Sequence, residues 1–166
     1  MQGFRQINEK TITPEIAQRE FHYDKETGKL YRNYAGGREL TGFATNGYNF
    51  VKINGQTYRS THIIWLIVYG RHPSGIIDHE DTNGMNDRFT NLREATQSQN
   101  IANASKYRNN KSGIKGVSWN KAKRKWTAQI GYNYTTIYLG QFDNIEEAKE
   151  AYNTKAKELF GEFARP

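Results

Sequence analysis

The chain has 166 residues, 36% of them hydrophobic and 25% charged, which suffices for one ordinary domain or two small ones with a modest core. It contains no cysteine, which excludes disulfide bonds and cysteine-ligated zinc and agrees with a reducing cytoplasm. No apolar run approaches the length of a membrane span, and the N-terminal residues lack the apolar region of a signal peptide. We therefore expect a cytoplasmic protein with no membrane partner.

The formal net charge of +7 favours a polyanionic partner, and this charge is unevenly distributed. Residues 1–105 hold 12 Lys and Arg against 11 Asp and Glu, whereas residues 106–166 hold 12 against 6. The residues between 106 and 125 include no acid and eight bases: Lys106, Arg108, Lys111, Lys115, Lys121, Lys123, Arg124 and Lys125. Such a run is either a solvated linker or a segment that follows phosphates, and the aromatic residues beside it, Tyr107, Trp119 and Trp126, favour phosphate binding.

The first predicted element is a helix that starts at the letters TPE, residues 13–15, with a capping hydroxyl, a proline at the first helical position and an early acid. It is expected to run to about Phe21. A turn at 24–28 and a strand at 30–34 follow, and the glycine pair at 36–37 is expected to break that strand.

A hairpin and an apolar segment come next. The alternating letters YNFVKI at 48–53 precede Asn54 and Gly55, a dipeptide that favours a tight hairpin turn, and QTYRS at 56–60 supplies the returning strand. The nine apolar letters HIIWLIVYG at 62–70 fit a helix or a strand by period alone, and their terminal glycine favours a helix.

The C-terminal third predicts a small α+β module. Three short strands rich in aromatic and β-branched residues are expected within 114–140, with hairpin loops between them. Asn144 and Glu147 form a candidate capping box at the start of a helix that Gly161 would end. The expected buried face of this helix comprises Ile145, Ala148, Ala151, Tyr152, Ala156 and Leu159.

Residues 76–100 hold the strongest chemical pattern. A short strand at 76–78 leads into Asp78 and His79, and Thr96 with Gln99 forms a capping box that predicts a helix running past Asn103. Phosphodiester hydrolysis needs an activated water and a hard cation, and the stretch offers both a histidine base and oxygen ligands. Neighbours on a regular strand point to opposite faces, so Asp78 and His79 can share one site only if the chain bends there. Glu80, Asp81 and Asp87 therefore stay open as alternative carboxylates of the site. A turn-rich surface loop without a site is the other alternative.

The order of these residues resembles the HNH (ββα-metal) nucleases, and most closely their phage and intron-encoded homing type, over roughly residues 12–103. The residues that carry the resemblance are Gly47-Tyr48, Asn54-Gly55, Tyr58, His62, Trp65, Ile77-Asp78-His79, Asn86, Asn91-Leu92-Arg93, Ala95-Thr96 and Asn100.

The resemblance implies a site for one divalent metal ion, Mg²⁺ by expectation with Mn²⁺ as the alternative. It implies Asp78 and Asn100 as metal ligands, His79 as the general base and Asn91 as the residue that orients the His-bearing loop. Many relatives have histidine where Asn100 stands, which leaves the metal preference open.

The remaining polar residues of this region receive lesser roles. We expect Asn86 to shape the loop, and Asn103 to face elsewhere or contact DNA. Arg93 would contact the scissile phosphate or pair with an acid. His62 is expected to be a hydrogen-bonded packing residue. His22 and His72 belong to no motif and are expected to be surface residues.

Residues 113–165 resemble the APETALA2-type (ethylene-response-factor) DNA-binding domain, which lays a three-stranded sheet into the major groove and backs it with a helix. The residues that carry the resemblance are Gly116-Val117, Trp119, Trp126, Ala128, Ile130, Tyr138-Leu139-Gly140, Phe142, Glu147-Ala148, Ala151-Tyr152 and Gly161 to Pro166. Several arginines of the plant domains are replaced here, by Lys115, Ser118, Gly131 and Thr136, so the plant recognition sequence does not transfer.

Strand alternation independently assigns the two faces of this sheet. The residues expected to face the helix are Trp126, Ala128, Ile130, Ile137 and Leu139, whereas Trp119 is open between core and surface. The residues expected to face outward are Lys125, Thr127, Gln129, Thr136 and Tyr138. By resemblance, the base- or backbone-contact positions are Lys115, Ser118, Gln129, Thr136 and Tyr138. The residues expected to contact phosphates are Lys121, Lys123, Arg124 and Lys125.

The sequence thus predicts an α+β protein with an N-terminal helix–strand segment (1–46), an HNH core (47–105), a basic linker (106–112) and an APETALA2-type domain (113–166). The expected function is a homing-type endonuclease acting on double-stranded DNA in a bacterial host cell, most simply a monomer that nicks one strand, with a dimer as the alternative. A DNA-binding regulator with an inactive nuclease segment, a structural packaging protein and an RNA-directed nuclease are the competing functions.

Overall fold

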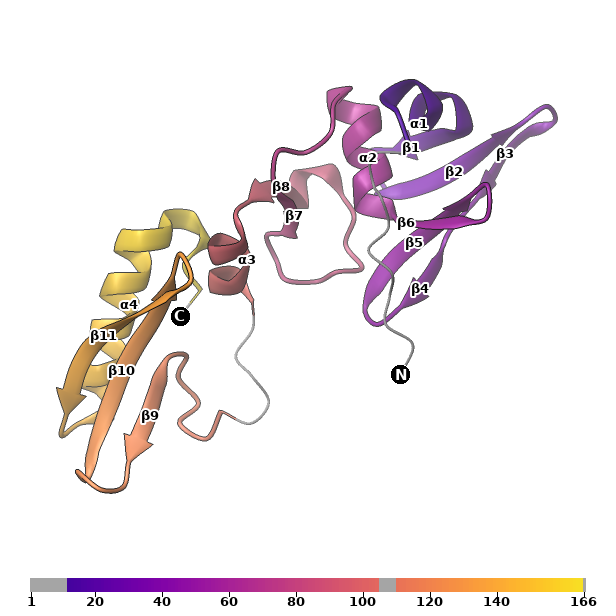
Figure 1. Ribbon diagram of the computed structural model, residues 1–166. Helices are drawn as coiled ribbons and strands as arrows, with labels where there is room; N and C mark the ends of the chain where they lie inside the picture. Colours follow the sequence, from indigo (N-terminus) through magenta and orange to yellow (C-terminus); the bar gives the residue numbers. More distant parts are fainter. Residues whose placement is uncertain (1–11, 105–109, 166) are drawn as a thin grey trace. The chain divides into compact units, whose positions relative to one another are not determined.

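The computed structural model describes residues 12–104 and 110–165 (Figure 1). The expectations that concern Lys106, Tyr107, Arg108 and Pro166 lie outside the described residues. The chain divides into two compact units, Met1–Glu94 and Ala95–Pro166. Within the described ranges, no helix is both long enough and apolar enough to cross a membrane.

The first unit begins with one helix and a three-stranded antiparallel sheet. Its elements are α1 (Pro14–Glu20), β1 (Phe21–Asp24), β2 (Lys29–Tyr34) and β3 (Gly37–Leu40), in the sheet order β1-β2-β3. The Thr13 hydroxyl accepts a hydrogen bond from the Ile16 N–H, which confirms the predicted helix start. Strand β2 ends at Tyr34 as predicted, and the break takes the form of a tight turn, since Tyr34 pairs with Gly37 and the chain returns as β3.

A second antiparallel sheet and a buried helix follow. These elements are β4 (Phe43–Thr45), β5 (Tyr48–Ile53), β6 (Gln56–Arg59) and α2 (Ser60–Tyr69). The predicted hairpin is confirmed, since Asn54 and Gly55 have φ values of 47° and 78° and connect the paired residues Ile53 and Gln56. The apolar run is a helix, and Gly70 ends it in the left-handed region with φ 64°.

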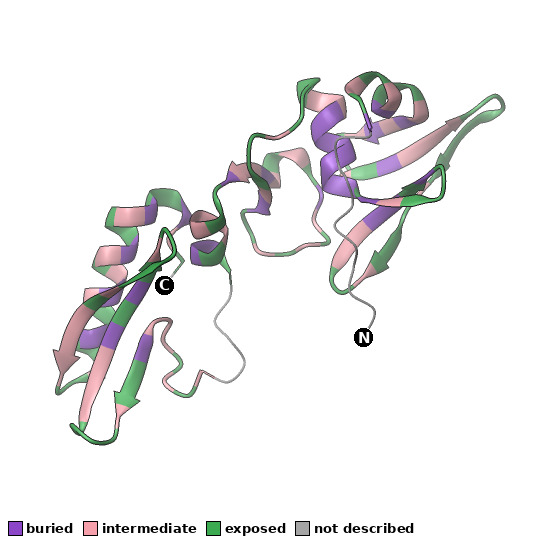
Figure 2. Ribbon diagram, in the orientation of Figure 1, coloured by how far each residue is buried: buried purple, intermediate pink, exposed green. Residues whose placement is uncertain are grey.

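Helix α2 is the centre of the first core (Figure 2). Its residues from Ser60 to Leu66 are all buried, which explains why its apolar letters showed no clear periodicity. Helix α1 packs against α2 and contributes the buried Ala17. The segment boundary expected between residues 46 and 47 falls within one sheet, because β4 pairs with β5.

A strand–strand–helix order follows, as the resemblance to HNH nucleases implied. It consists of β7 (Ile76–His79), the 3₁₀ turn η2 (Phe89–Asn91), β8 (Leu92–Ala95) and α3 (Gln97–Asn103). Strands β7 and β8 form a two-stranded sheet. Both hydrogen bonds of the predicted capping box between Thr96 and Gln99 are present at the start of α3. The two units divide between Glu94 and Ala95, so α3 belongs to the second unit.

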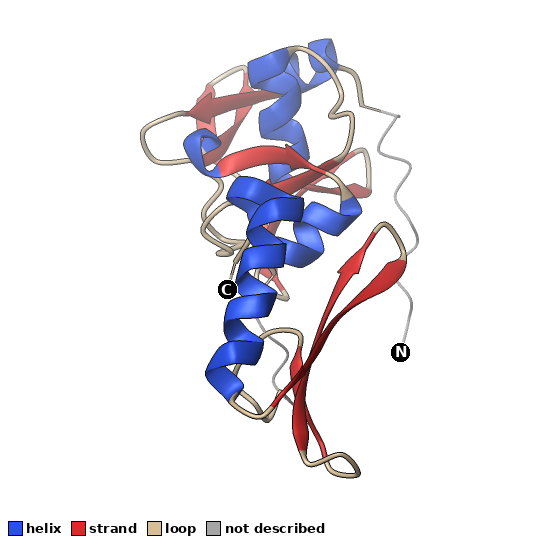
Figure 3. Cartoon of the chain, turned by 90° about the vertical axis from the view of Figure 1, so that its left-hand side faces the viewer, coloured by secondary structure: helices blue, strands red, loops and turns tan. Residues whose placement is uncertain are grey.

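The second unit is a three-stranded antiparallel sheet backed by one helix (Figure 3). Besides α3, its elements are β9 (Val117–Asn120), β10 (Lys125–Tyr132), β11 (Thr135–Phe142), α4 (Ile145–Phe160) and η3 (Gly161–Phe163), in the sheet order β11-β10-β9. The core includes Ala128 and Ile130 of β10, and Ala148, Tyr152 and Ala156 of α4. The predicted inward face is confirmed, with Trp126, Ile137 and Leu139 partly buried against this core.

Two details of the second unit differ from simple patterning. The register of β10 against β11 shifts between Ala128 and Gln129, opposite Gly140, whose φ is 137°. At the start of α4, Asn144 accepts from the Glu146 N–H, one residue earlier than a capping box with Glu147 would require.

Candidate active site

A buried histidine–aspartate pair lies at the end of β7. The Nε2 atom of His79 is 3.0 Å from Oδ1 of Asp87, and the two residues are only 6% and 4% exposed. Because a carboxylate only accepts hydrogen bonds, Nε2 is the donor in this contact and carries a proton. Asp87 is therefore the residue that fixes the tautomer of His79.

Asp87 is itself held by two other elements of the first unit. Asn49 of β5 donates to its second carboxylate oxygen at 2.9 Å, and the Tyr23 hydroxyl of β1 donates to its backbone carbonyl at 3.2 Å. The same hydroxyl accepts from the Phe89 N–H at 2.7 Å. Burial raises the pKa of Tyr23, and the nearby Asp87 charge adds to this, which keeps the hydroxyl protonated as a donor. The sequence pattern left Asp87 among three competing carboxylates, and only the fold pairs it with His79.

Asp78, the expected metal ligand beside His79, forms a different contact. Its Oδ2 accepts from Nε of Arg93, on the neighbouring strand β8, at 3.1 Å. Asp78 and His79 thus turn to different partners, as strand alternation requires. Of the two roles expected for Arg93, the structure shows the pairing with an acid.

Asn91 fastens the loop that follows His79 at both its ends. The side chain of Asn91 accepts from the Asp81 N–H at 3.0 Å and donates to the Asp81 carboxylate at 2.9 Å and to the Asn86 carbonyl at 2.8 Å. Its backbone carbonyl accepts from the Glu80 N–H at 2.9 Å. These contacts are what a residue that orients the His-bearing loop would make.

Asp81 is the polar centre of this loop. Its carboxylate also accepts from the Asn86 side chain at 2.7 Å and from the Asn83 N–H at 2.8 Å, so Asn86 shapes the loop as expected. Burial alone would raise the pKa of Asp81, but the hydrogen bonds from Asn86, Asn83 and Asn91 outweigh it and lower the pKa below its ordinary value. Asp81 is therefore engaged in folding the loop rather than held as a proton donor.

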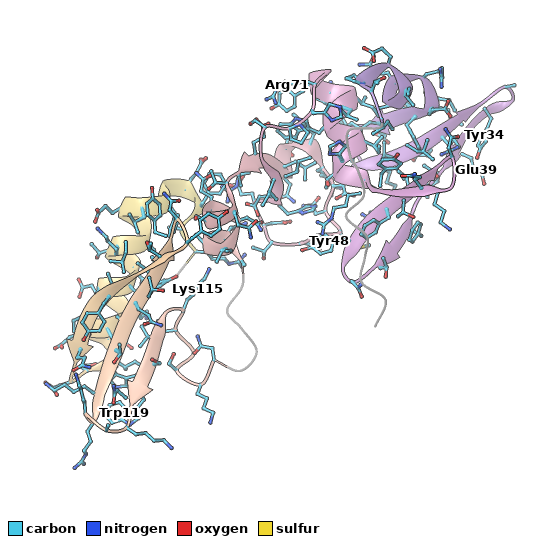
Figure 4. The ribbon with its side chains drawn as sticks, viewed as in Figure 1. Tyr34, Glu39, Tyr48, Arg71, Lys115 and Trp119 are labelled. Carbon is cyan, nitrogen blue, oxygen red and sulfur yellow. The ribbon has the colours of Figure 1, made fainter. Side chains whose placement is uncertain are left out.

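Gly84 lets the loop approach the β4–β5 turn. A Cβ atom at this position would collide with the Gly47 carbonyl and with the Tyr48 ring. The Tyr48 ring centroid is in turn 6.1 Å from that of His79 (Tyr48 is labelled in Figure 4). Tyr48, one of the residues that carry the resemblance to HNH nucleases, thus contacts both the loop and the His79 ring.

The donors expected for a metal ion are carboxylate and carboxamide oxygens. These hard ligands suit Mg²⁺ or Mn²⁺, and Mg²⁺ is commonly held by one or two carboxylates with water and substrate phosphate completing the shell. Within the residues that the structure describes, no three His, Asp or Glu side chains form a metal-binding group. Asp78 lies in the first unit, whereas Asn100 lies in the middle of α3 in the second.

Two histidines outside the motif contact each other. His62 is buried, and its Nε2 lies 3.3 Å from Nδ1 of His72, which confirms the packing role expected for His62. His72 is exposed, which confirms the expected surface position, and His62 is its ring partner. His22 is half-buried beside Tyr31. Asn103 is buried in the second unit, so it does not offer its side chain to DNA in this structure.

Three of the five residues expected on the outward face of the C-terminal sheet are exposed, whereas Lys125 and Thr127 are half-buried and the Thr127 hydroxyl is buried. Gln129 pairs with Tyr138 across β10 and β11, and both are exposed, as are Thr136 and Ser118. Trp119, which sequence left open, is 45% exposed and packs edge to face on Trp126 (Figure 4). This face combines hydrogen-bonding groups with ring surfaces, the composition of a groove-reading sheet.

Cations gather at the β9–β10 end of this sheet. Lys121, Lys123 and Arg124 are exposed in the loop, and Lys125 follows at the start of β10 with an exposed ion pair to Asp143 at 3.1 Å. Pairs of this kind contribute little to stability and are readily exchanged for a phosphate. The loop is therefore compatible with the phosphate contacts expected of it.

Lys115 makes a different contact from the one expected. Its ammonium donates to backbone carbonyls of α3 and of the residue after it: those of Ile101 at 3.0 Å, Ala102, and Ala104 at 2.8 Å (Figure 4). An ammonium has three N–H donors, so these carbonyls use all of them. Burial lowers the pKa of Lys115 to about 8, and the charge of Arg165 adds to this shift.

Comparisons with known proteins match both parts of the chain. The family model for HNH endonuclease matches residues 60–102, which contain the His79 site, and the AP2 domain model matches residues 112–162. A protein of Acanthamoeba polyphaga mimivirus described as an uncharacterized HNH endonuclease is 41% identical over 105 residues. Protein 3.8 of Escherichia phage T7 is 35% identical over 103 residues. The chain belongs to the HNH endonuclease family and carries an AP2 domain.

The extent of these matches differs between the two relatives. The matched region is 63% of this chain and 54% of the giant-virus protein, so the chain spans about half the length of that relative. For the phage protein the shares are 61% and 84%. No solved structure matches the chain. The segment that the HNH family model matches contains the site residues from His62 to Asn100.

Proposed function

We propose that the chain is a metal-dependent DNA endonuclease of the homing type that hydrolyses one phosphodiester bond per site and so nicks one strand. The observation that supports this most directly is the buried His79–Asp87 pair at the end of β7, within the segment that the HNH family model matches. Its position after a short strand, followed by a loop that Asn91 fastens, suits a positioned base better than a stray surface histidine.

In this proposal His79 is the general base. With the Nε2 proton held by Asp87, its Nδ1 accepts a proton from water, the water oxygen bonds to phosphorus, and the bond from phosphorus to O3′ breaks. Asn91 holds the loop that begins beside His79. Asp78 and Asn100 are the proposed ligands of one divalent cation, Mg²⁺ with Mn²⁺ as the alternative. Such an ion supplies charge neutralisation at the phosphate and at the leaving oxygen.

The AP2 domain supplies the proposed contacts to double-stranded DNA. Exposed Gln129, Thr136 and Tyr138 would face base edges or the backbone, with Ser118 beside them. Lys121, Lys123, Arg124 and Lys125 would contact phosphates, and Arg93 would reach the scissile phosphate only after leaving Asp78. A monomer with one site cuts one strand, so cutting of both strands requires a dimer or two successive events.

A DNA-binding regulator with an inactive nuclease segment is the second candidate. One observation favours it: the Asp78 carboxylate, the proposed metal ligand, is paired with Arg93. In that function the AP2 domain alone would carry the activity.

Nicking of supercoiled plasmid with Mg²⁺ or Mn²⁺ separates the two functions. We expect open circles from the wild-type chain, loss of nicking in His79→Ala, and retained nicking in His22→Ala, a half-buried histidine in β1 that serves as the control. Each variant is first shown to bind DNA and to unfold cooperatively. Equal nicking by wild type and His79→Ala would contradict the base assignment, and tight, salt-sensitive binding without any nicking would favour the regulator.

A further inference from the structure

Helix α3, which carries Asn100, is packed into the core of the second unit. Ala95 before the helix and Ala102 within it are buried in the same hydrophobic cluster as Tyr152 and Phe160 of α4. An isolated helix of seven residues is unstable in water, because its few hydrogen bonds do not offset the cost of nucleation. Tertiary contacts of this kind therefore decide whether α3 forms.

The hairpin between β10 and β11 holds the beginning of α3. The Asn133 N–H donates to the Ser98 hydroxyl at 3.1 Å, and that hydroxyl lies 3.4 Å from the Asn133 side-chain oxygen. Asn133 occupies the hairpin turn, with φ 46°, so its position is set by the two strands of the AP2 sheet. The first turn of α3 is thus fastened to the sheet.

Lys115 holds the end of the same helix. The last carbonyls of a helix lack intrahelical partners and carry the negative end of the helix dipole, so a cation there stabilises it. The Lys115 ammonium donates to the carbonyls of Ile101, Ala102 and Ala104, and it is only partly exposed. A partly buried ammonium is costly unless its donors are satisfied, and here the helix end satisfies them. Lys115 precedes β9 and is thus also placed by the AP2 domain.

We propose that the AP2 domain holds α3 as one of its own elements, through Lys115 at one end and the Ser98–Asn133 contact at the other, and thereby positions Asn100. This inference rests on the proposed nuclease function. Its consequence is that the AP2 domain is needed for the cleavage step itself, not only for residence on DNA. Lys115 is a positioning residue in this scheme rather than a phosphate contact.

The test compares full-length Lys115→Met with Lys121→Met, which removes a proposed phosphate contact, and with Lys157→Met, on the exposed side of α4. Three quantities are measured: DNA affinity as a function of salt, the nicking rate at saturating DNA as Mg²⁺ is raised, and hydrogen exchange of the α3 amides. Ser98→Ala, a milder change at the other end of α3, is measured in the same way.

We expect Lys115→Met to keep DNA affinity within about 2-fold, to lower the nicking rate about 10-fold or more with a higher Mg²⁺ requirement, and to speed exchange in α3. Ser98→Ala should show the same pattern more weakly, and Lys157→Met should match the wild type. Lys121→Met should instead weaken DNA binding and lower the salt slope by about 1, with α3 exchange unchanged.

The opposite result for Lys115→Met would overturn the inference. That result is weaker DNA binding with a reduced salt slope and an unchanged rate at saturation, as for a phosphate contact. If the wild-type chain does not nick DNA at all, the proposed function fails separately, and α3 exchange alone then decides whether Lys115 holds the helix. Unchanged α3 exchange in both Lys115→Met and Ser98→Ala would contradict the inference in every case.

Discussion

The Asp87 carboxylate accepts a hydrogen bond from Nε2 of His79 at 3.0 Å, and Asn49 donates to the other carboxylate oxygen. Asp87→Asn would replace an acceptor by a group whose amide can donate to Nε2, and so favour the tautomer with the proton on Nδ1. We predict that this variant loses nicking activity by about 10²- to 10⁴-fold while DNA affinity stays near that of the wild type. Single-turnover nicking at saturating DNA measures the rate, and a binding titration measures the affinity.

Two comparisons make that result specific. His79→Ala combined with Asp87→Asn should be no slower than His79→Ala alone, because the two residues act through one group. Asn49→Ala should lower the rate less than Asp87→Asn, because it removes a hydrogen bond to the carboxylate but leaves the carboxylate on Nε2. If the double variant were much slower than His79→Ala, Asp87 would have a role independent of the histidine.

Asn91→Ala is predicted to destabilise the first unit. The side chain of Asn91 makes three hydrogen bonds to the loop that follows His79, and its removal leaves the Asp81 N–H and the Asn86 carbonyl without these partners. We expect a loss of about 2–3 kcal/mol in the free energy of unfolding, measured by urea denaturation. Asn83→Ala, which changes a more exposed residue of the same loop, should cost clearly less, and equal losses would contradict the bracing role of Asn91.

The β10–β11 turn contains a strained residue whose replacement should stabilise the second unit. Asn133 and Tyr134 both have positive φ, 46° and 64°, and the Tyr134 side chain is 98% exposed with no packing to compensate. Tyr134→Gly should raise the free energy of unfolding by about 1 kcal/mol, since glycine adopts this conformation without steric cost. The reciprocal change Gly55→Tyr, at the matching position of the Asn54-Gly55 turn, should lower it by a similar amount. If Tyr134→Gly and Gly55→Tyr both left the free energy of unfolding at the wild-type value, backbone strain in these turns would be excluded.

Glu94 should make the first unit sensitive to acid. Its carboxylate receives two hydrogen bonds from the Arg71 guanidinium, at 2.8 and 2.9 Å, and one from the Ser74 N–H at 2.6 Å. These contacts, with the Arg71 hydrogen bond as the largest cause, lower the pKa of Glu94 from 4.5 to about 2. A carboxyl group with a lowered folded-state pKa stabilises the fold above its unfolded value and loses this contribution as pH falls.

We therefore predict that the free energy of unfolding falls by about 1 kcal/mol between pH 4.5 and 2 through Glu94, after allowance for solvent screening of this partly exposed pair. Glu94→Gln should remove that part of the pH dependence and leave the rest. Glu39→Gln, at an exposed position on β3, is the control (Figure 4). An unchanged pH profile in Glu94→Gln would contradict the assignment.

The elements that could be predicted from sequence are those whose signals lie within a few residues. Helix starts at Thr13 and Thr96, the hairpin at Asn54-Gly55 and the alternation of β10 depend on local hydrogen bonds and on the direction of successive side chains. For the same reason the spacing from Asp78 to Asn100 indicated the HNH family. The N-terminal strands β1, β3 and β4 were missed. Residues in β3 and β4 show little alternation in burial, and β1 alternates over only four residues directly after a helix.

The sequence by itself thus determined the class of each module and the residue types of the candidate site. Only the tertiary structure decided which residues meet: Asp87 contacts Nε2 of His79, and Lys115 contacts α3. Such contacts depend on how a loop closes and on which carbonyls lack partners, and neither can be predicted from the spacing of residues within one segment. The position of α3 in the second unit likewise follows from burial of Ala95 and Ala102 in a core that residues 117–163 complete.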